Sequence, residues 1–169
     1  MFYCENFIER TIKSVIDQTY PNTEYIIIDG GSTDNTLNII KKKQNRIDLI
    51  LSEKDEGIYD AMNKGLDHTT GDLVYFLNAR DYFYDNDVLG KVIEKANLYP
   101  DYGIIYRDYI YYDDNSQEEC SGYREGIPDL LRKGYCHQTV FAKGQYFWCP
   151  GNSIPDTEYT ATSTGYFDR

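Results

Sequence analysis

Long apolar runs are missing from this 169-residue sequence. A helix needs about 20 consecutive apolar residues to span a bilayer, and no segment approaches that length, so the sequence predicts no transmembrane helix. The start also lacks the apolar stretch of a signal peptide, because Glu5, Glu9 and Arg10 interrupt it. We therefore expect a cytoplasmic protein, with peripheral attachment to the inner face of a membrane left open.

Positive charge is scarce: 17 Lys and Arg stand against 28 Asp and Glu, a formal net charge of -11. A nucleic-acid backbone needs clustered cations, so nucleic acid is not expected as the main partner. The four cysteines are scattered without a C-x-x-C pair, which predicts reduced thiols and no zinc site. Neither G-x-x-x-x-G-K-[ST] nor G-x-G-x-x-G is present, which disfavours a P-loop enzyme and a nicotinamide dehydrogenase.

What the sequence does contain is an alternation of strand and helix patterns. Short apolar runs predict strands at Tyr25–Ile28, Ile47–Leu51, Leu73–Leu77 and Gly103–Tyr106. Between them, apolar residues recur at helical spacing, first at Ile8, Ile12, Val15 and Ile16, then from Leu37, from Ile58 to Leu66, and from Val88 to Ala96. This rhythm predicts one α/β domain with a largely parallel sheet.

The rhythm fails after Asp113. Asp113–Glu119 reads as a polar hairpin or loop, Asp129–Arg132 as a short helix and Gln138–Phe141 as a strand, while Trp148–Arg169 has no clear period. With no internal repeat and no long linker, we expect a single domain over residues 1–169.

Polar clusters follow three of the predicted strands. They are Asp29–Asp34, Ser52–Gly57 and Asn78–Asp81. One such cluster alone is more often a plain strand-to-helix loop. Three of them at the carboxyl ends of parallel strands share one rim, where open sheets bind ligands. The glycines allow a close backbone approach, and Asp29 can accept a hydrogen bond from a base or ribose, so the rim has the geometry of a nucleotide site.

At this point the sequence resembles a known family. The blocks that carry the resemblance to family 2 glycosyltransferases are Glu9–Tyr20, Glu24–Thr36, Ser52–Gly65, Gly71–Leu77 and Cys136–Phe141. They stand in order and cover most of positions 5–142. The resemblance implies a GT-A (Rossmann-like) fold with a mostly parallel sheet flanked by helices. It also implies inverting transfer of a sugar from a nucleotide-diphosphate donor, usually a UDP-sugar, to a glycan or lipid-linked acceptor, with Mg or Mn.

The resemblance also assigns residues to the donor. Asp29 matches the carboxylate that reads the nucleobase, with Gly31 and Ser32 beside it, and Asp55 lies in the second donor-side segment. Lys64 faces the donor or is a solvated helix residue, two readings of equal weight. Met62 stands where many relatives carry an arginine, and its helical spacing favours packing in the core.

Asn78-Ala79-Arg80 stands in the place of the family's Asp-x-Asp motif, and Asp81 matches a carboxylate that often follows it. In relatives the last Asp of the motif binds the metal, and a guanidinium offers no oxygen ligand. Three interpretations compete: Arg80 binds the diphosphate itself, Asp81 holds a metal while Arg80 pairs with an anion, or the site is degenerate and Arg80 is merely tolerated. We favour the third on sequence grounds.

Two further features bear on activity. Relatives have a full strand before the first helix, and we expect it to be missing here, which leaves an unpaired edge on Tyr25–Ile28. His137 is a candidate catalytic residue, with an ordinary structural histidine as an equal alternative, and Asp156 and Asp168 are weaker candidates for the base. An inactive remnant that binds a nucleotide or a partner therefore stays open, and a nucleotidyltransferase is disfavoured by Arg80.

Overall fold

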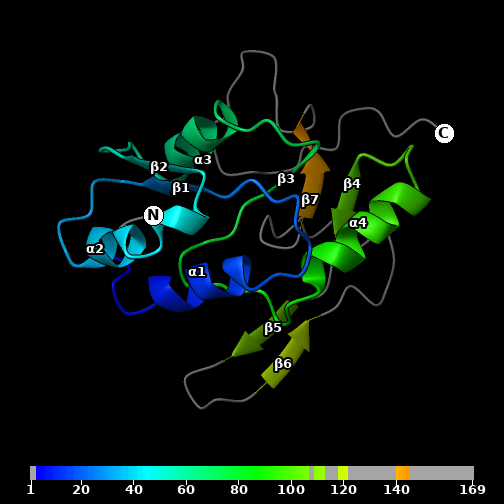
Figure 1. The fold of residues 1–169 in the computed structure, drawn as a ribbon, viewed down its shortest axis with the longest axis horizontal. Helices are drawn as coiled ribbons and strands as arrows, with labels where there is room; N and C mark the ends of the chain where they lie inside the picture. Colours follow the sequence, from blue (N-terminus) through cyan, green and yellow to red (C-terminus); the bar gives the residue numbers. More distant parts are fainter. Residues whose placement is uncertain (1–2, 107–108, 113–117, 122–139, 145–169) are drawn as a thin grey trace.

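The computed structural model describes residues 3–106, 109–112, 118–121 and 140–144 (Figure 1). The helices are α1 (Ile8–Ile16), α2 (Thr36–Lys41), η1 (a 3-10 turn, Gln44–Arg46), α3 (Ile58–Leu66) and α4 (Val88–Leu98). The strands are β1 (Ile26–Asp29), β2 (Leu49–Ser52), β3 (Leu73–Tyr75), β4 (Ile104–Tyr106), β5 (Tyr109–Tyr112), β6 (Glu118–Ser121) and β7 (Val140–Lys143). The predicted alternation of helices and strands up to β4 is confirmed.

The strands form three groups. β1 and β2 pair in parallel, with Asp29 opposite Ser52 at their carboxyl ends. β7 lies between β3 and β4 and is antiparallel to both, so β3 and β4 run in one direction. β5 and β6 form an antiparallel pair, as expected of a hairpin there. The predicted α/β class is confirmed, and β7 is the exception to the parallel direction.

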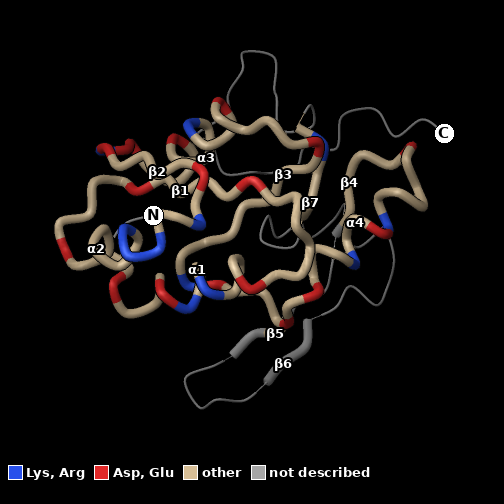
Figure 2. The backbone as a smooth tube through the Cα atoms, viewed as in Figure 1, with Lys and Arg blue, Asp and Glu red and all other residues tan. Residues whose placement is uncertain are grey.

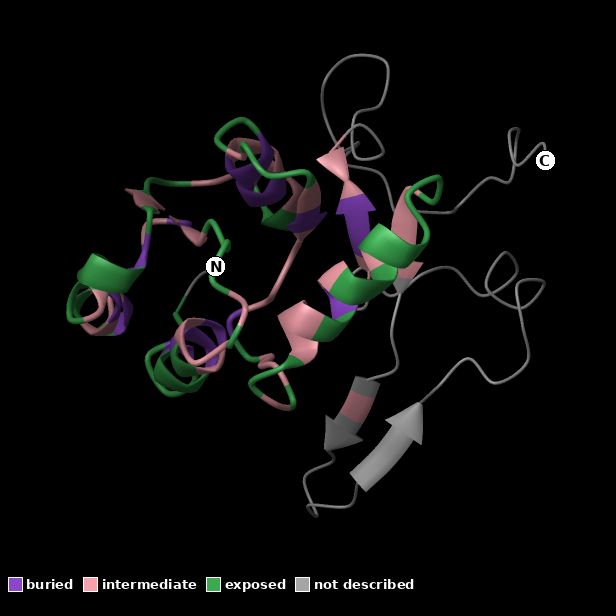
Figure 3. Ribbon diagram, turned by 45° about the vertical axis from the view of Figure 1, so that its right-hand side comes forward, coloured by how far each residue is buried: buried purple, intermediate pink, exposed green. Residues whose placement is uncertain are grey.

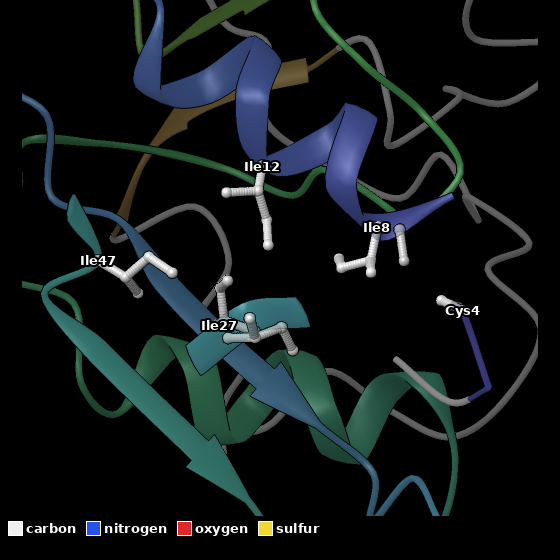
Figure 4. Close-up of a cluster of buried hydrophobic side chains, with 7 residues drawn as sticks. Cys4, Ile8, Ile12, Ile27 and Ile47 are labelled. Atoms are coloured by element: carbon white, nitrogen blue, oxygen red, sulfur yellow. The ribbon is translucent and has the colours of Figure 1, made fainter. Parts of the chain in front are cut away.

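The main core lies between α1, β1 and α2. Its buried members are Cys4, Ile8, Ile12, Ile27, Ile40, Ile47 and Ala79 (Figure 4). Ile12 and Ile40 have no exposed surface. α1 and α3 lie on opposite faces of the β1–β2 pair, each with its buried residues turned inward (Figures 1 and 3). The helical spacing in the sequence therefore predicted the packed faces, except that Ile58 at the start of α3 is 49% exposed.

A second core cluster joins α3 to β3. Met62, Leu66 and Val74 are buried there, with Tyr59 and Phe76 packed against them. Met62 is only 8% exposed, which confirms the prediction that it packs in the core. No helix in the described part of the chain is both long and apolar enough to cross a membrane.

A large cavity separates β1 from β3. Its volume is about 1820 Å³, and it is lined by the consecutive residues Tyr25 to Ile28 and Leu73 to Ala79. A cavity over the face of a sheet would touch alternate residues of a strand, so continuous lining shows that it runs along the strand edges. Within the described ranges no strand joins the β1–β2 pair to the β3–β7–β4 group.

Candidate functional site

Asp29 ends β1 and is completely buried. Its carboxylate accepts hydrogen bonds from the Ser32 backbone N–H at 2.9 Å and from the Ser32 hydroxyl at 2.6 Å. The Ser52 hydroxyl, at the end of β2, donates a third at 2.8 Å. Gly31 adopts a φ of +80°, which turns the chain so that Ser32 can reach back to Asp29. In this arrangement Asp29 holds the ends of β1 and β2 together from inside.

The segment before α1 is fastened to the same loop. The Tyr3 backbone N–H donates to the Ser32 hydroxyl at 3.1 Å, and the Cys4 N–H donates to the Thr36 hydroxyl at 2.9 Å. Thr36 has no exposed surface, so the second of these bonds is shielded from water. The start of α1 is therefore fixed relative to the carboxyl edge of β1.

Asp55 lies directly over Gly30. A Cβ placed on Gly30 would collide with the Asp55 carboxylate, at 2.9 Å from its Cγ and 3.2 Å from Oδ1. The carboxylate fills the space that a side chain at Gly30 would take. Asp55 is half-buried, lines the cavity between β1 and β3, and accepts a hydrogen bond from the Gly57 N–H at 3.2 Å. Of the two predicted donor-side carboxylates, it is the one that faces open space.

Lys64 on α3 is engaged within the protein. Its ammonium lies 2.9 Å from the Glu53 carboxylate and 3.0 Å from that of Asp60. It also donates to the Lys54 carbonyl at 3.1 Å. The hydrogen bonds to Glu53 and then Asp60 raise the pKa of Lys64. The three donors of the ammonium thus have partners, and Lys64 ties the segment that carries Asp55 to α3.

The segment Asn78–Asp81 follows β3 and is held along α1. Thr11 is only 3% exposed, and its single O–H is shared between the carbonyls of Ala79 at 2.9 Å and Asp81 at 2.8 Å. One turn later, the Ser14 hydroxyl accepts from the Phe83 N–H at 3.1 Å. α1 therefore fixes the backbone on both sides of Arg80.

Two arginines near the segment Asn78–Asp81 make cation–π contacts with aromatic rings. The Arg80 guanidinium lies 4.8 Å from the centre of the Phe7 ring, and that of Arg10 lies 3.5 Å from the centre of the Tyr82 ring. Sequence reasoning missed both Phe7 and Thr11. For Thr11 a signal existed, because a threonine between Ile8, Ile12 and Val15 lies on the buried face of the helix.

Among the described residues, the segment Asn78–Asp81 does not fit a divalent metal by itself. Mg and Mn favour several oxygen ligands, and the segment in the Asp-x-Asp place offers the Asn78 amide and the Asp81 carboxylate with a guanidinium between them. The described residues contain no group of three or more His, Cys, Asp or Glu side chains that could hold an ion. The assignment of Asp81 as a metal ligand therefore stays a prediction without structural support.

The cavity brings together part of the predicted set. Asp55, Asn78, Arg80 and Asp81 line it, and Gly30 lines it in front of the buried Asp29. Gly31, Ser32 and Lys64 shape or brace the surrounding loops without lining it. His137, Asp156 and Asp168 lie outside the described residues.

Comparisons with known proteins agree on one family. The model described as "Glycosyl transferase family 2" matches residues 1–148. A PGL/p-HBAD biosynthesis glycosyltransferase of Mycobacterium bovis is 32% identical over 139 residues, covering 80% of this chain and 54% of the relative. An uncharacterized glycosyltransferase of Haemophilus influenzae is 36% identical over 94 residues, 54% of this chain and 37% of the relative. The chain thus spans about half, or less, of the length of these curated relatives.

Solved structures share the fold. S. aureus TarS 1–349 in complex with UDP-GlcNAc superposes with a TM-score of 0.72 at 19% identity, covering 87% of this chain and 44% of the TarS 1–349 chain. Mannosyltransferase PcManGT from Pyrobaculum calidifontis, in complex with GDP-Man and Mn2+, gives 0.67 at 18% identity, with 87% and 43% covered. These neighbours have the GT-A fold, which confirms the predicted fold class. Because the family model matches residues 1–148 of the 169, the chain belongs to glycosyl transferase family 2.

Proposed function

We propose that this chain carries the donor site of a transferase that takes a sugar from a nucleoside diphosphate, with UDP as the nucleotide. One observation carries the proposal: polar residues from three strand ends meet at one cavity, namely Asp55 after β2, and Asn78 and Arg80 after β3, beside Gly30 at the end of β1. TarS, which shares the fold, is seen with UDP-GlcNAc. The acceptor is a glycan or a lipid-linked molecule.

The base selectivity follows from hydrogen-bond chemistry. Uracil presents an N3–H donor, whereas cytosine presents a lone pair at the same ring position, so a carboxylate favours uracil. Asp55 is the carboxylate at the cavity wall, and the glycine at position 30 leaves room for it there. Asp29 supports this wall from behind, and its direct contact with the base stays a prediction.

The transfer that fits this donor is a single displacement that inverts the anomeric centre. A base removes the proton of the acceptor hydroxyl, and cationic or hydrogen-bond donors stabilise the leaving diphosphate. Asp81 and His137 are the candidates for the first role. A non-catalytic nucleotide-binding module is the alternative, and Arg80 in place of the family's metal ligand is the observation that favours it.

Calorimetric titration of the chain with UDP, CDP and ADP tests the donor site. We expect UDP to bind more tightly than CDP or ADP, and Asp55→Asn to abolish the preference over CDP, since an amide can also donate to cytosine. Glu56→Gln is the matched control, because it removes the same charge from an exposed neighbour that does not line the cavity. Equal affinity of the unaltered chain for UDP and CDP would rule the assignment out. Turnover of a UDP-sugar then separates an enzyme from a binding module.

A further inference from the structure

We propose that Arg80 binds the diphosphate of the donor directly, as the cation of a metal-independent site, and that Phe7 is the positioning residue that holds its guanidinium. This inference rests on the proposed function. It replaces the interpretation that Arg80 is merely tolerated. The position of Arg80 is fixed by its contacts, and its charge is free to bind an anion. Four observations support it.

The first observation is that the backbone around Arg80 is fixed. The carbonyls of its two neighbours, Ala79 and Asp81, both accept from the buried Thr11 hydroxyl. The Asp81 N–H closes a turn on the Asn78 carbonyl at 3.0 Å. With both flanking carbonyls directed at α1, the position of the Arg80 Cα is set by the helix rather than by a freely moving loop.

The second observation concerns the guanidinium. Its central carbon lies over the Phe7 ring, 4.8 Å from the ring centre, which is within cation–π distance. A contact with an aromatic ring draws on the charge of the group, and within the described ranges its N–H groups donate no hydrogen bond, so they stay available for a ligand. Phe7 therefore limits the motion of the side chain without consuming its hydrogen-bond donors.

The third observation is the absence of a competing carboxylate. Within the described ranges no Asp or Glu oxygen lies within 4.0 Å of the Arg80 guanidinium, whereas Lys13, Lys64 and Lys91 each form ion pairs with acidic residues. Arg80 is exposed, lines the cavity and pairs with no acidic residue in the part of the chain that the structure describes. Its charge is available to an anion.

The fourth observation is the position of Arg80 relative to Asp55 and the loop after Asp29, where we propose that the base binds. The Phe7 N–H donates to the Cys4 carbonyl at 2.9 Å, and the Cys4 N–H donates to the hydroxyl of Thr36, the first residue of α2. Phe7 is thus tied to the start of α2, which follows the loop that begins after Asp29. Arg80 and Asp55 line the same cavity, as the phosphate and base ends of one nucleotide require.

A diphosphate suits this group chemically. The planar fork of an arginine can donate two parallel hydrogen bonds to phosphate oxygens, and the bonds are charge-assisted. A divalent ion would need oxygen ligands that the segment Asn78–Asp81 does not supply in number. The geometry therefore assigns neutralisation of the diphosphate to Arg80.

Calorimetric titrations with UDP and with uridine, in EDTA and in manganese chloride, test the assignment. Arg80→Gln should weaken UDP binding by about tenfold or more and leave uridine binding unchanged. Manganese should tighten UDP binding to the unaltered chain by less than about twofold, since the ion lacks ligands there. UDP affinity that survives Arg80→Gln, or a tenfold gain with manganese on the unaltered chain, overturns the inference. Failure of both UDP and uridine to bind would instead reject the proposed function.

The role of Phe7 has its own matched series. Phe7→Leu keeps an apolar side chain but removes the aromatic face, and should weaken UDP binding roughly two- to fivefold. Phe7→Trp keeps an aromatic ring at this position and should bind UDP as tightly as the unaltered chain. Tyr82→Leu, which removes the ring under Arg10, is the control and should leave UDP binding unchanged. Equal losses in the Leu and Trp variants of Phe7 would show that the ring does not position Arg80.

Discussion

Replacing Thr11 by valine should loosen the segment that carries Arg80 and destabilise the fold by a predictable amount. Valine keeps the shape and β-branching of threonine, so the change removes the hydroxyl with little effect on helix propensity. The single O–H is shared between two carbonyl oxygens, in a buried contact with Ala79 and a partly buried contact with Asp81. A buried carbonyl left without a donor costs about 1–3 kcal/mol, and water can reach the second one, so we expect a loss of about 1–2 kcal/mol.

Urea denaturation followed by circular dichroism measures this loss. With an m-value of about 2 kcal/mol/M, the midpoint should fall by roughly 0.5–1 M at unchanged slope. Thr11→Ser keeps the hydroxyl and should therefore keep most of the stability that Thr11→Val loses. An unchanged midpoint in Thr11→Val would refute the reasoning, because the two carbonyls would then not depend on this donor.

The same variant separates stability from function. Ser14→Ala also removes an α1 hydroxyl that bonds to this segment, but its partner is the Phe83 N–H, farther from Arg80. Both variants should be destabilised, and only Thr11→Val should weaken UDP binding. Similar losses of UDP affinity in the two would mean that general loosening, rather than the position of Arg80, controls binding.

Two further predictions concern the neighbouring loop. Gly30→Ala should displace the Asp55 carboxylate and remove the preference for UDP over CDP, whereas Gly71→Ala, whose new methyl group meets only ordinary contacts, should not; titration of both nucleotides decides this. Lys64→Met should release the segment that carries Asp55, because its ion pairs and its bond to the Lys54 carbonyl are lost. Faster hydrogen exchange at residues 54–57 is the expected sign, and unchanged exchange contradicts it.

Elements whose signal is local could be predicted from the sequence. The spacing of Ile8, Ile12 and Val15 places them on one face of a helix, and the structure buries all three. The apolar run before Asp29 becomes β1, although the observed strand begins one residue later than predicted, at Ile26. Periodicity reports which residues of one element face the core, and this information is contained in a few turns of chain.

Contacts between distant segments could not be predicted in this way. The antiparallel insertion of β7 joins residues near 141 to those near 74, and no periodicity encodes that pairing. Thr11 meets the carbonyl of Ala79 across 68 positions of sequence. The sequence also could not show that Asp29 is buried behind Gly30. An aspartate at a strand end gives the same sequence signal whether its carboxylate binds a ligand or, as here, two serine hydroxyls.

An acidic protein that binds an anionic donor is physically consistent once distance is considered. The chain has a net charge of -11, and in its described part the acidic residues are spread over loops and helices (Figure 2). At physiological ionic strength the Debye length is about 8 Å, so exposed carboxylates farther than this from the diphosphate repel it only weakly. A guanidinium in direct contact is screened much less, and its hydrogen bonds add to its charge. One arginine held at the end of β3, without an acidic partner among the described residues, can therefore decide the local sign of the field although the whole chain is negative.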